Sequence, residues 1–411
     1  MPLTLAGTGC RVIITSFKIM SIAMNTQHLF RRLAVTGLIT VLSGALTGPA
    51  QAQKSRIAPP KIGGLKLRVG PEVKIAGATN SIGHQFEDGR ICIVGDEGKG
   101  IWTHDGGKTW KEGPRGPDDK TTFNLGSGEV LSIARTSVKR ADGKFNIYQR
   151  RSPDNWKTVV DEEAIIDSPL ASSTGGDTGE HHDGLLVHHG AIRLKNGDLM
   201  ISTYGNYHSD TELADGYPEE FKMLKYRTVV LFSSDNGKTW GNPVTVAYDQ
   251  QLGRGTDDDS SVQTTMIVPA QTQEGFCESD LEWAADGKTI ICAMRSGGRI
   301  GVRKAPSFPT PLFISRSVDE GKTWTPPVPV ADRGVCPYLV TLENGVIVCS
   351  YARPGDWLIF SDDDGESWKG AFEFGPGGGY NTIFEVEPNK FIVIYHRDSS
   401  YVAQHFSVER E

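Results

Sequence analysis

The stretch Thr103-His104-Asp105-Gly106-Gly107-Lys108-Thr109-Trp110 sets a pattern that the chain repeats. Close copies stand at residues 233–240, 317–324 and 361–368, and a shortened copy without the glycine is Ser152-Pro153-Asp154-Asn155-Trp156. The pattern Ser/Thr-x-Asp-x-Gly-x-Thr/Ser-Trp suits a tight turn between strands, because Asp accepts backbone N–H groups and Gly adopts positive φ. The Trp is expected to pack between neighbouring sheets. Recurrence of such a turn predicts a repeat architecture.

A second repeat runs in step with the first. Six turn signals precede short apolar runs, and several of them are Asn-Gly or Asp-Gly pairs, which are strong hairpin signals. They are Asp88-Gly89, Ser127-Gly128, Asn196-Gly197, Asp286-Gly287, Asn344-Gly345 and Pro388-Asn389, followed by runs at 90–94, 130–134, 198–202, 289–293, 346–349 and 391–394. Six inner and five outer hairpins predict an all-β fold, a six-bladed β-propeller of four-stranded antiparallel blades. The sixth outer hairpin, near 398–407, is expected to be short and to complete its sheet with the N-terminal part of the mature chain.

The turn pattern resembles the Asp-box, or bacterial neuraminidase repeat, of the sialidase superfamily. The resemblance covers about residues 75–407. It implies a six-bladed propeller and the activity of a glycosidase. The boxes themselves are structural and also occur in propellers that hydrolyse nothing, so function depends on the site.

Residues 1–52 resemble a secretory signal peptide. They contain four basic residues and no acid, an apolar run at 33–46, and the Ala-x-Ala sequence Ala50-Gln51-Ala52. Met24 gives the usual short basic region, so the true start is expected there. The apolar run is shorter than the ~20 residues of a membrane-spanning helix. We therefore expect an exported protein, periplasmic or extracellular, whose residues 53–411 form one domain without a membrane span.

Charge and cysteine content exclude several classes of function. The formal charge of −7 becomes −11 when the four cations of residues 1–52 are removed, which gives no electrostatic basis for binding nucleic acid. The five remaining cysteines are odd in number and irregularly spaced, which disfavours a zinc site. A disulfide between Cys277 and Cys336 is an alternative that the sequence leaves open, because the two cysteines occupy matching places in adjacent units. No metal or cofactor is expected.

Arginines recur at one offset from the inner hairpins. Arg295 and Arg353 lie eight residues after Gly287 and Gly345, and Arg397 lies eight after Asn389. The same offset in the third unit reaches Gly205, beside Tyr204. Equal offsets bring the side chains to one level around one axis, where guanidinium groups repel unless they meet an anion. They predict a site for a carboxylate or sulfate, since Arg offers a planar bidentate fork; structural pairing of each Arg with a nearby acid is the alternative.

Two segments resemble catalytic segments of sialidases. Cys277-Glu278-Ser279-Asp280-Leu281 resembles the one carrying the catalytic Glu, and Gly379-Tyr380-Asn381 the one carrying the nucleophilic Tyr. The resemblance implies that Glu278 removes the proton of Tyr380. A neutral phenol suits a substrate whose own carboxylate would repel an acidic nucleophile, but its pKa near 10 requires such a base.

The first unit departs from the family pattern. Residues 78–84 contain no Arg where the family has its first one, and the loop expected to carry the acid/base Asp is only 95–100. Asp96 is the candidate there, with Glu97 as an alternative.

The third unit carries an unusual set of His and Tyr residues. His189, Tyr204 and His208 flank its inner strands and are candidate substrate contacts. His and Tyr beside Arg would also serve a uronate lyase, because Arg neutralises the carboxylate while His or Tyr moves the C5 proton. A metal site at 181–183 is disfavoured, because neighbouring residues on an extended chain point opposite ways.

The sequence favours a secreted, exo-acting glycoside hydrolase that releases terminal, acidic sugars from glycans or acidic oligosaccharides. Tyr380 and Glu278 are its expected nucleophile pair. A polysaccharide lyase or different glycosidase on the same scaffold, and a non-catalytic glycan-binding propeller, remain open alternatives.

Overall fold

The structure is a computed structural model that describes residues 61–175, 179–214, 217–249, 272–297 and 310–411. Within these ranges the chain is built of β-strands, with two short 3₁₀ turns, η1 (Asp96–Gly98) and η2 (Glu219–Phe221). No helix among the described residues is long and apolar enough to cross a membrane. The predicted signal peptide, residues 1–52, lies outside the described residues.

The strands form six antiparallel units in chain order. Unit 1 is β3 (Ala78–Gln85), β4 (Ile91–Gly95), β5 (Gly100–Thr103) and β6 (Lys111–Gly113), and unit 2 is β7 (Thr121–Gly126), β8 (Glu129–Lys139), β9 (Phe145–Ser152) and β10 (Val160–Ile166). Unit 3 is β13 (Leu186–Arg193), β14 (Leu199–Tyr207), β15 (Arg227–Ser233) and β16 (Thr239–Ala247), and unit 4 is β17 (Cys277–Trp283), β18 (Ile290–Arg295), β19 (Leu312–Ser317) and β20 (Val328–Ala331). Unit 5 is β21 (Val335–Thr341), β22 (Ile347–Ala352), β23 (Asp356–Ser361) and β24 (Lys369–Gly375), and unit 6 is β25 (Thr382–Glu387), β26 (Lys390–Arg397), β27 (Ser400–Arg410) and β2 (Leu65–Ile75). Each predicted apolar run corresponds to the second strand of its unit.

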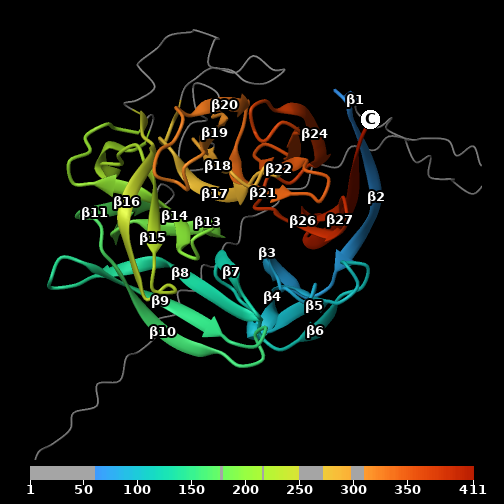
Figure 1. The fold of residues 1–411 in the computed structure, drawn as a ribbon, viewed down its shortest axis with the longest axis horizontal. Coiled ribbons are helices and arrows are strands. Elements are labelled where there is room, and N and C mark those ends of the chain that lie inside the picture. Colours follow the sequence, from blue (N-terminus) through green and yellow to red (C-terminus); the bar gives the residue numbers. More distant parts are fainter. Residues whose placement is uncertain (1–60, 176–178, 215–216, 250–271, 298–309) are drawn as a thin grey trace, which may run out of the picture. The chain divides into compact units, whose positions relative to one another are not determined.

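Unit 6 is completed from the other end of the sequence. β2 pairs with β27 in a register that runs from Leu65↔Arg410 to Ile75↔Tyr401, and the short β1 (Lys61–Ile62) pairs with β2. Figure 1 shows the blue β2 beside the red β27. This confirms that a strand from the N-terminal side of the described residues completes the last sheet. The expectation of a short outer strand was wrong, because β27 has 11 residues.

Units 2 and 3 are joined more closely than the others. β10 pairs in parallel with β16, which merges both units into one ten-stranded sheet. A further hairpin, β11 (Ala171–Gly175) and β12 (Glu180–Asp183), extends from β14. The Ser, Gly and Asp residues of this region give no apolar pattern that would reveal these short strands in the sequence.

The second strands are apolar on both faces because each is buried between two units. In β14, Leu199 and Ile201 pack in a cluster with unit 2, while Met200 packs in a cluster with unit 4. This follows from the alternation of side chains along a strand. Comparable clusters lie between every two successive units, and one with Ile93 and Ile394 joins unit 1 to unit 6. Burial on both faces therefore explains the continuous apolar runs.

The repeated turns are held by their Asp side chains. In the 233–240 copy, Asp235 Oδ1 accepts the backbone N–H groups of Lys238 and Thr239 at 3.1 and 2.9 Å, while Oδ2 accepts the Thr239 hydroxyl at 2.6 Å. The Ser233 hydroxyl accepts the N–H of Gly237 at 2.8 Å. Gly237 has φ 83°, a conformation that favours glycine.

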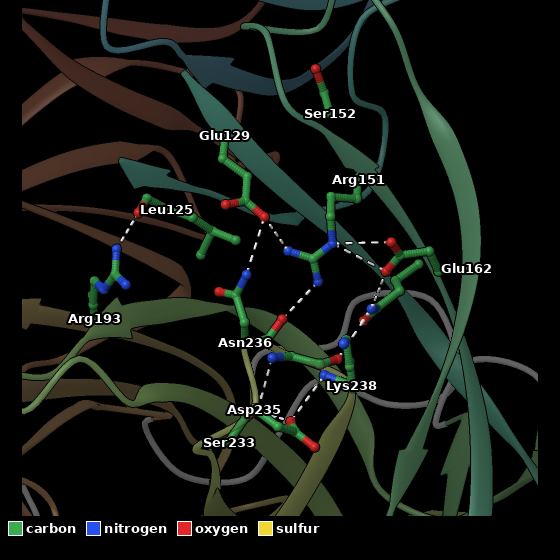
Figure 2. Close-up of polar contacts among 12 residues, drawn as sticks. Leu125, Glu129, Arg151, Ser152, Glu162, Arg193, Ser233, Asp235, Asn236 and Lys238 are labelled. Carbon is green, nitrogen blue, oxygen red and sulfur yellow. Dashed lines mark hydrogen bonds and ion pairs between the residues drawn. The ribbon is translucent and has the colours of Figure 1, made fainter. Parts of the chain in front are cut away.

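Each described turn also docks on the preceding unit. Figure 2 shows Arg151, on β9, donating to the Asn236 carbonyl at 2.7 Å and to Glu129 and Glu162 of its own unit. Asn236 Nδ2 donates to the same Glu129 at 3.2 Å. Elsewhere His405 contacts the Gly106 carbonyl at 3.0 Å. In each antiparallel sheet, the repeated turns lie at one end and the second strand finishes at the opposite end. Docking of the turns therefore leaves the opposite end available for a site.

Candidate active site

Three predicted residues meet at the other end of the sheets. Tyr380, just before β25, donates its phenolic O–H to Glu278 Oε1 at 2.5 Å. Arg295, the last residue of β18, donates from Nη1 to Glu278 Oε2 at 2.6 Å. One carboxylate therefore joins a phenol from unit 6 to a guanidinium from its own unit. The structure brings together Tyr380, Glu278 and Arg295, and it pairs Arg295 with a nearby acid, which is the alternative to the predicted anion site.

The three side chains differ in depth. Arg295 and Glu278 are 1% and 2% exposed, whereas Tyr380 is partly exposed. Arg295 Nη2 also lies 3.6 Å from the buried Glu274, and its Nε donates to the Gly297 carbonyl at 2.8 Å. Two carboxylates thus neutralise a guanidinium that lies beneath the pair. Arg295 orients Glu278, and Tyr380 is the member that faces solvent.

Unit 2 adds a lysine to this group. Lys120, the residue before β7, places Nζ 3.5 Å from the centre of the Tyr380 ring, and this atom lies 3.1 Å from His188 Nε2. A charged ammonium has only donors, so His188 Nε2 accepts and the ring proton resides on Nδ1. Lys120 is partly buried and His188 is 1% exposed.

Unit 2 also supplies an accessible guanidinium. Arg135 is exposed, and its Nη2 donates to the hydroxyl of the fully buried Tyr204 at 2.8 Å. Its charge also interacts with Glu278 and Tyr380. The predicted residue Tyr204 therefore anchors an Arg, and the exposed Arg presents its remaining donors to solvent.

Two side chains of unit 5 hold the segment that carries Tyr380. Asp356 accepts the backbone N–H groups of Gly377 and Gly378 at 3.0 Å each. Arg353 Nε donates to the Gly378 carbonyl at 3.3 Å. On the other side, the Ser81 hydroxyl of unit 1 donates to the Tyr380 carbonyl at 2.6 Å. Neighbouring units thus fix the backbone on which the phenol is placed.

The site coincides with irregular first strands. β13, β17 and β21 each have a register shift, and each contains one non-glycine residue in the left-handed region: His189 at φ 48°, Glu278 at φ 43° and Cys336 at φ 49°. This left-handed backbone conformation costs free energy in residues other than glycine, and it is found disproportionately often at functional sites. His189 Nε2 lies 4.0 Å from Cys336 Sγ. The register shift in β17 interrupts the regular alternation of side chains along that strand, and Glu278 lies at this shift in contact with Tyr380.

Burial and neighbouring charge shift the titration of these groups. Burial, followed by the charge of Glu278, raises the pKa of Tyr380 well above 10. Burial lowers the pKa of His189 to about 3 and that of His188 well below 6.5, where the charge of Lys120 acts in the same direction. Burial also lowers the pKa of Lys120, although Cys336 and Glu278 oppose the change. At neutral pH the phenol is protonated and both imidazoles are neutral.

Other predicted residues lie apart from the Tyr380–Glu278 pair in the described contacts. Arg397, at the end of β26, forms an ion pair with Glu72 of β2. His208 is exposed, and Asp96 is exposed in η1. Arg397 reaches the expected level, but β2, supplied by the distant N-terminal segment, carries the acid that pairs with it.

Lys120 and Arg135 were missed by the sequence analysis. Lys120 precedes the first strand of its unit as Tyr380 does in unit 6, so its position was a usable signal. Arg135 comes seven residues after Gly128 rather than eight, and β8 has a register shift between Ile133 and Ser137. A search for Arg exactly eight residues after each hairpin turn therefore misses Arg135, because β8 is irregular there.

Cys277 and Cys336, considered as a pair above, are both buried and are not joined to each other by a disulfide. No group of three or more His, Cys, Asp or Glu side chains that could hold a metal ion occurs within the described residues.

No protein-family model matches the sequence, and no curated protein sequence matches it. Solved structures do match. A protein of unknown function from Dyadobacter fermentans has a TM-score of 0.52 at 16% identity, covering 84% of this chain and 99% of its own. A GH93 α-L-arabinofuranosidase of Fusarium graminearum, solved with arabinobiose, has a TM-score of 0.53 at 14% identity over 83% and 98% of the chains.

The Hadza microbial sialidase Hz136 is a third match, with a TM-score of 0.50 at 12% identity, covering 80% of this chain and 65% of the sialidase. At such identities the similarity establishes the fold alone. The chain therefore has the all-β propeller fold found in these glycosidases, and its chemistry must be argued from the residues of its own site.

Proposed function

We propose that the protein is a glycoside hydrolase of the sialidase-like type, in which Tyr380 is the nucleophile and Glu278 its base. The observation that carries the proposal is the 2.5 Å hydrogen bond from the Tyr380 hydroxyl to Glu278 Oε1. A buried carboxylate fixed by Arg295 accepts the proton that the phenol must lose, and the partly exposed phenol faces the substrate. This is the geometry expected of a nucleophile with an adjacent, oriented base.

The reaction is proposed to proceed in two displacements. In the first, the Tyr380 proton passes to Glu278, the phenolate oxygen bonds to the anomeric carbon, and the bond to the leaving oxygen breaks. A proton donor, for which Asp96 is the candidate, protonates that oxygen. In the second, water attacks the anomeric carbon and gives its proton to Asp96, while Tyr380 leaves and regains its proton from Glu278. Two inversions retain the anomeric configuration.

The cations near Tyr380 support an anionic substrate. Lys120, Arg135 and Arg353 are partly or fully exposed, whereas Glu278 and Glu274 are buried and face Arg295. The chain as a whole carries a formal charge of −7, so these cations are a local feature. Arg in particular suits a carboxylate or sulfate. We propose that the enzyme acts in exo mode on terminal acidic sugars.

The contacts of the third unit favour hydrolysis over the lyase alternative. Tyr204 is fully buried and its hydroxyl accepts a bond from Arg135, while His208 is exposed. His189 stacks on His188 at 4.3 Å between ring centres. The described contacts do not gather His189, Tyr204 and His208 around one opening, as proton abstraction from a uronate would require.

The proposal includes the finer description of the fold and the location. We propose a six-bladed propeller, supported by the six units and the apolar cluster between units 6 and 1, and we propose that the repeated turns are Asp-boxes. Export with cleavage after Ala52 is proposed from the sequence of residues 1–52. Amino-terminal sequencing of the secreted protein should begin at Gln53; an intact residue 1–52 segment would refute export by cleavage.

The function is tested by incubating purified protein with aryl glycosides and oligosaccharides, including sialosides, uronides, sulfated sugars and neutral arabinosides. The expected result is release of a terminal anionic sugar with retained configuration, which proton NMR detects in the first product. An unsaturated uronate, seen by its ultraviolet absorbance, would instead identify a lyase. Binding without turnover across the panel would favour the glycan-binding alternative.

A further inference from the structure

Lys120 has no part in the proton transfer from Tyr380 to Glu278, yet its ammonium lies over the reacting side chain. Nζ is 3.5 Å from the centre of the Tyr380 ring. Cation–π contact within about 6 Å is attractive even with a neutral phenol. The attraction grows when the phenol loses its proton, because the negative charge is delocalised over the ring.

The ammonium is held in place by a neutral partner. His188 Nε2 lies 3.1 Å from Lys120 Nζ, and the buried His188 Nδ1 has no hydrogen-bond partner within the described residues. The imidazole therefore acts as an acceptor that does not compensate the charge of Lys120. A carboxylate at the position of His188 would have neutralised the charge of Lys120. The neutral His188 leaves that charge to interact with the Tyr380 ring.

The remaining groups around Tyr380 do not supply this effect. Glu278 accepts the phenol proton, and its negative charge disfavours a phenolate, while Arg295 is already shared between Glu278 and Glu274. Cys336 of β21 holds its proton, because burial raises its pKa. Arg135 of β8 interacts with Tyr380 electrostatically, but its hydrogen bond goes to Tyr204.

We propose that Lys120 is a positioning residue that sets its charge on the face of the Tyr380 ring and stabilises the phenolate form of the nucleophile. The inference depends on the proposed function, in which Tyr380 is the nucleophile. Lys120 assists both displacements, since the phenolate attacks in the first and leaves in the second. In each step the proton moves only between Tyr380 and Glu278, and Lys120 keeps its own protons.

The direct test needs no substrate. A fluorotyrosine placed at position 380, which is more acidic than tyrosine, is titrated by ¹⁹F NMR in the full-length mature protein. Lys120→Met should raise the pKa of the fluorophenol by about 1–2 units, as expected for loss of a unit charge at this distance in a partly buried site. Lys120→Arg should restore most of the shift, because guanidinium also binds aromatic faces.

A matched control uses another lysine over an aromatic ring. Lys195 Nζ lies 5.6 Å from the centre of the Trp283 ring, and Lys195→Met should leave the fluorophenol titration unchanged. Melting temperatures of all variants show whether the fold is intact. With a confirmed substrate, Lys120→Met should lower kcat about 10- to 100-fold, the kinetic equivalent of 1–2 pKa units, with a smaller change in KM.

An unchanged fluorophenol titration in Lys120→Met would overturn the inference, and a rise in KM alone with an unchanged titration would overturn it in favour of direct substrate contact. Full activity of Tyr380→Phe would refute the proposed function instead. The two failures are distinguishable, because the titration reports on the Lys120–Tyr380 contact whether or not the protein hydrolyses a glycoside.

Discussion

At the scale of single residues, one carboxylate connects the candidate site. Glu278 accepts from Tyr380 with one oxygen and from Arg295 with the other. Because Arg295 is buried beneath it, Glu278 cannot rotate away without leaving a buried guanidinium partly unpaired, which is strongly destabilising. The carboxylate that we propose as the base is therefore held in place by the protein itself.

The role of Tyr380 is tested by removing one oxygen. Tyr380→Phe should reduce kcat at least about 1000-fold while the melting temperature stays close to that of the wild type, since the ring remains in place. Steady-state kinetics on a confirmed substrate measures the effect. Tyr148→Phe is the control, because it also deletes a phenol–carboxylate contact, to Asp161 at the surface. Undiminished turnover by Tyr380→Phe would rule out a Tyr nucleophile.

Arg135 is expected to bind the anionic group of the substrate. Arg135→Gln should raise KM about 10- to 100-fold on acidic substrates, from the loss of roughly 1.5–3 kcal/mol of charge-assisted hydrogen bonding. Arg140→Gln, on the same hairpin, is the control. We expect a smaller effect from Arg397→Gln, because Arg397 pairs with Glu72. If Arg135→Gln binds acidic substrates normally, the anion is held elsewhere.

At the scale of structural elements, the repeated turns connect one unit to the one before it. Their Asp side chains close each turn, while exposed backbone groups of the same turn dock on the neighbouring sheet. Arg151 is one of the links between units 2 and 3, and it joins Glu129, Glu162 and the Asn236 carbonyl. The turns therefore contribute to stability at the end opposite the candidate site.

This linkage predicts a loss of stability without a loss of activity. Arg151→Ala should lower the free energy of unfolding by about 1–3 kcal/mol, because a half-buried network loses the cation that joins its two carboxylates. Arg68→Ala is the matched control, since the exposed pair with Glu409 is expected to contribute little. Urea denaturation measures both. A stability equal to the wild type in Arg151→Ala would show that the turns dock without this network.

At the scale of the whole molecule, a buried acid of β17 gives stability a pH dependence. Burial raises the pKa of Asp280 to about 7 from 3.8, although the backbone N–H of Leu339 donates to it at 2.7 Å. The folded protein therefore keeps the proton up to about pH 7, whereas the unfolded chain releases it near pH 4. Stability falls as pH rises through this window and levels off above it.

Asp280→Asn should flatten this part of the stability curve. The titration of Asp280 changes the free energy of unfolding by at most about 4 kcal/mol, from three pKa units at 1.36 kcal/mol each. The neighbouring Glu282 alters this value. Thermal or chemical unfolding between pH 4 and 8 measures the slope for both proteins. Equal slopes for wild type and Asp280→Asn would contradict a protonated Asp280.

The sequence alone determined the repeat, the strand class and the candidate pair of Tyr380 and Glu278. Turn chemistry is local, so Asp105 and its counterparts reveal each hairpin, and strand alternation makes the buried second strands visible as apolar runs. Tyr380 and Glu278 were found because the short segments around them resemble segments of the sialidase superfamily. Tertiary structure decided what depends on neighbours: the bulge that redirects Arg135, the Glu72 that pairs with Arg397, and the meeting of Lys120 with Tyr380. Such contacts join residues hundreds of positions apart, and no local pattern encodes which of them will touch.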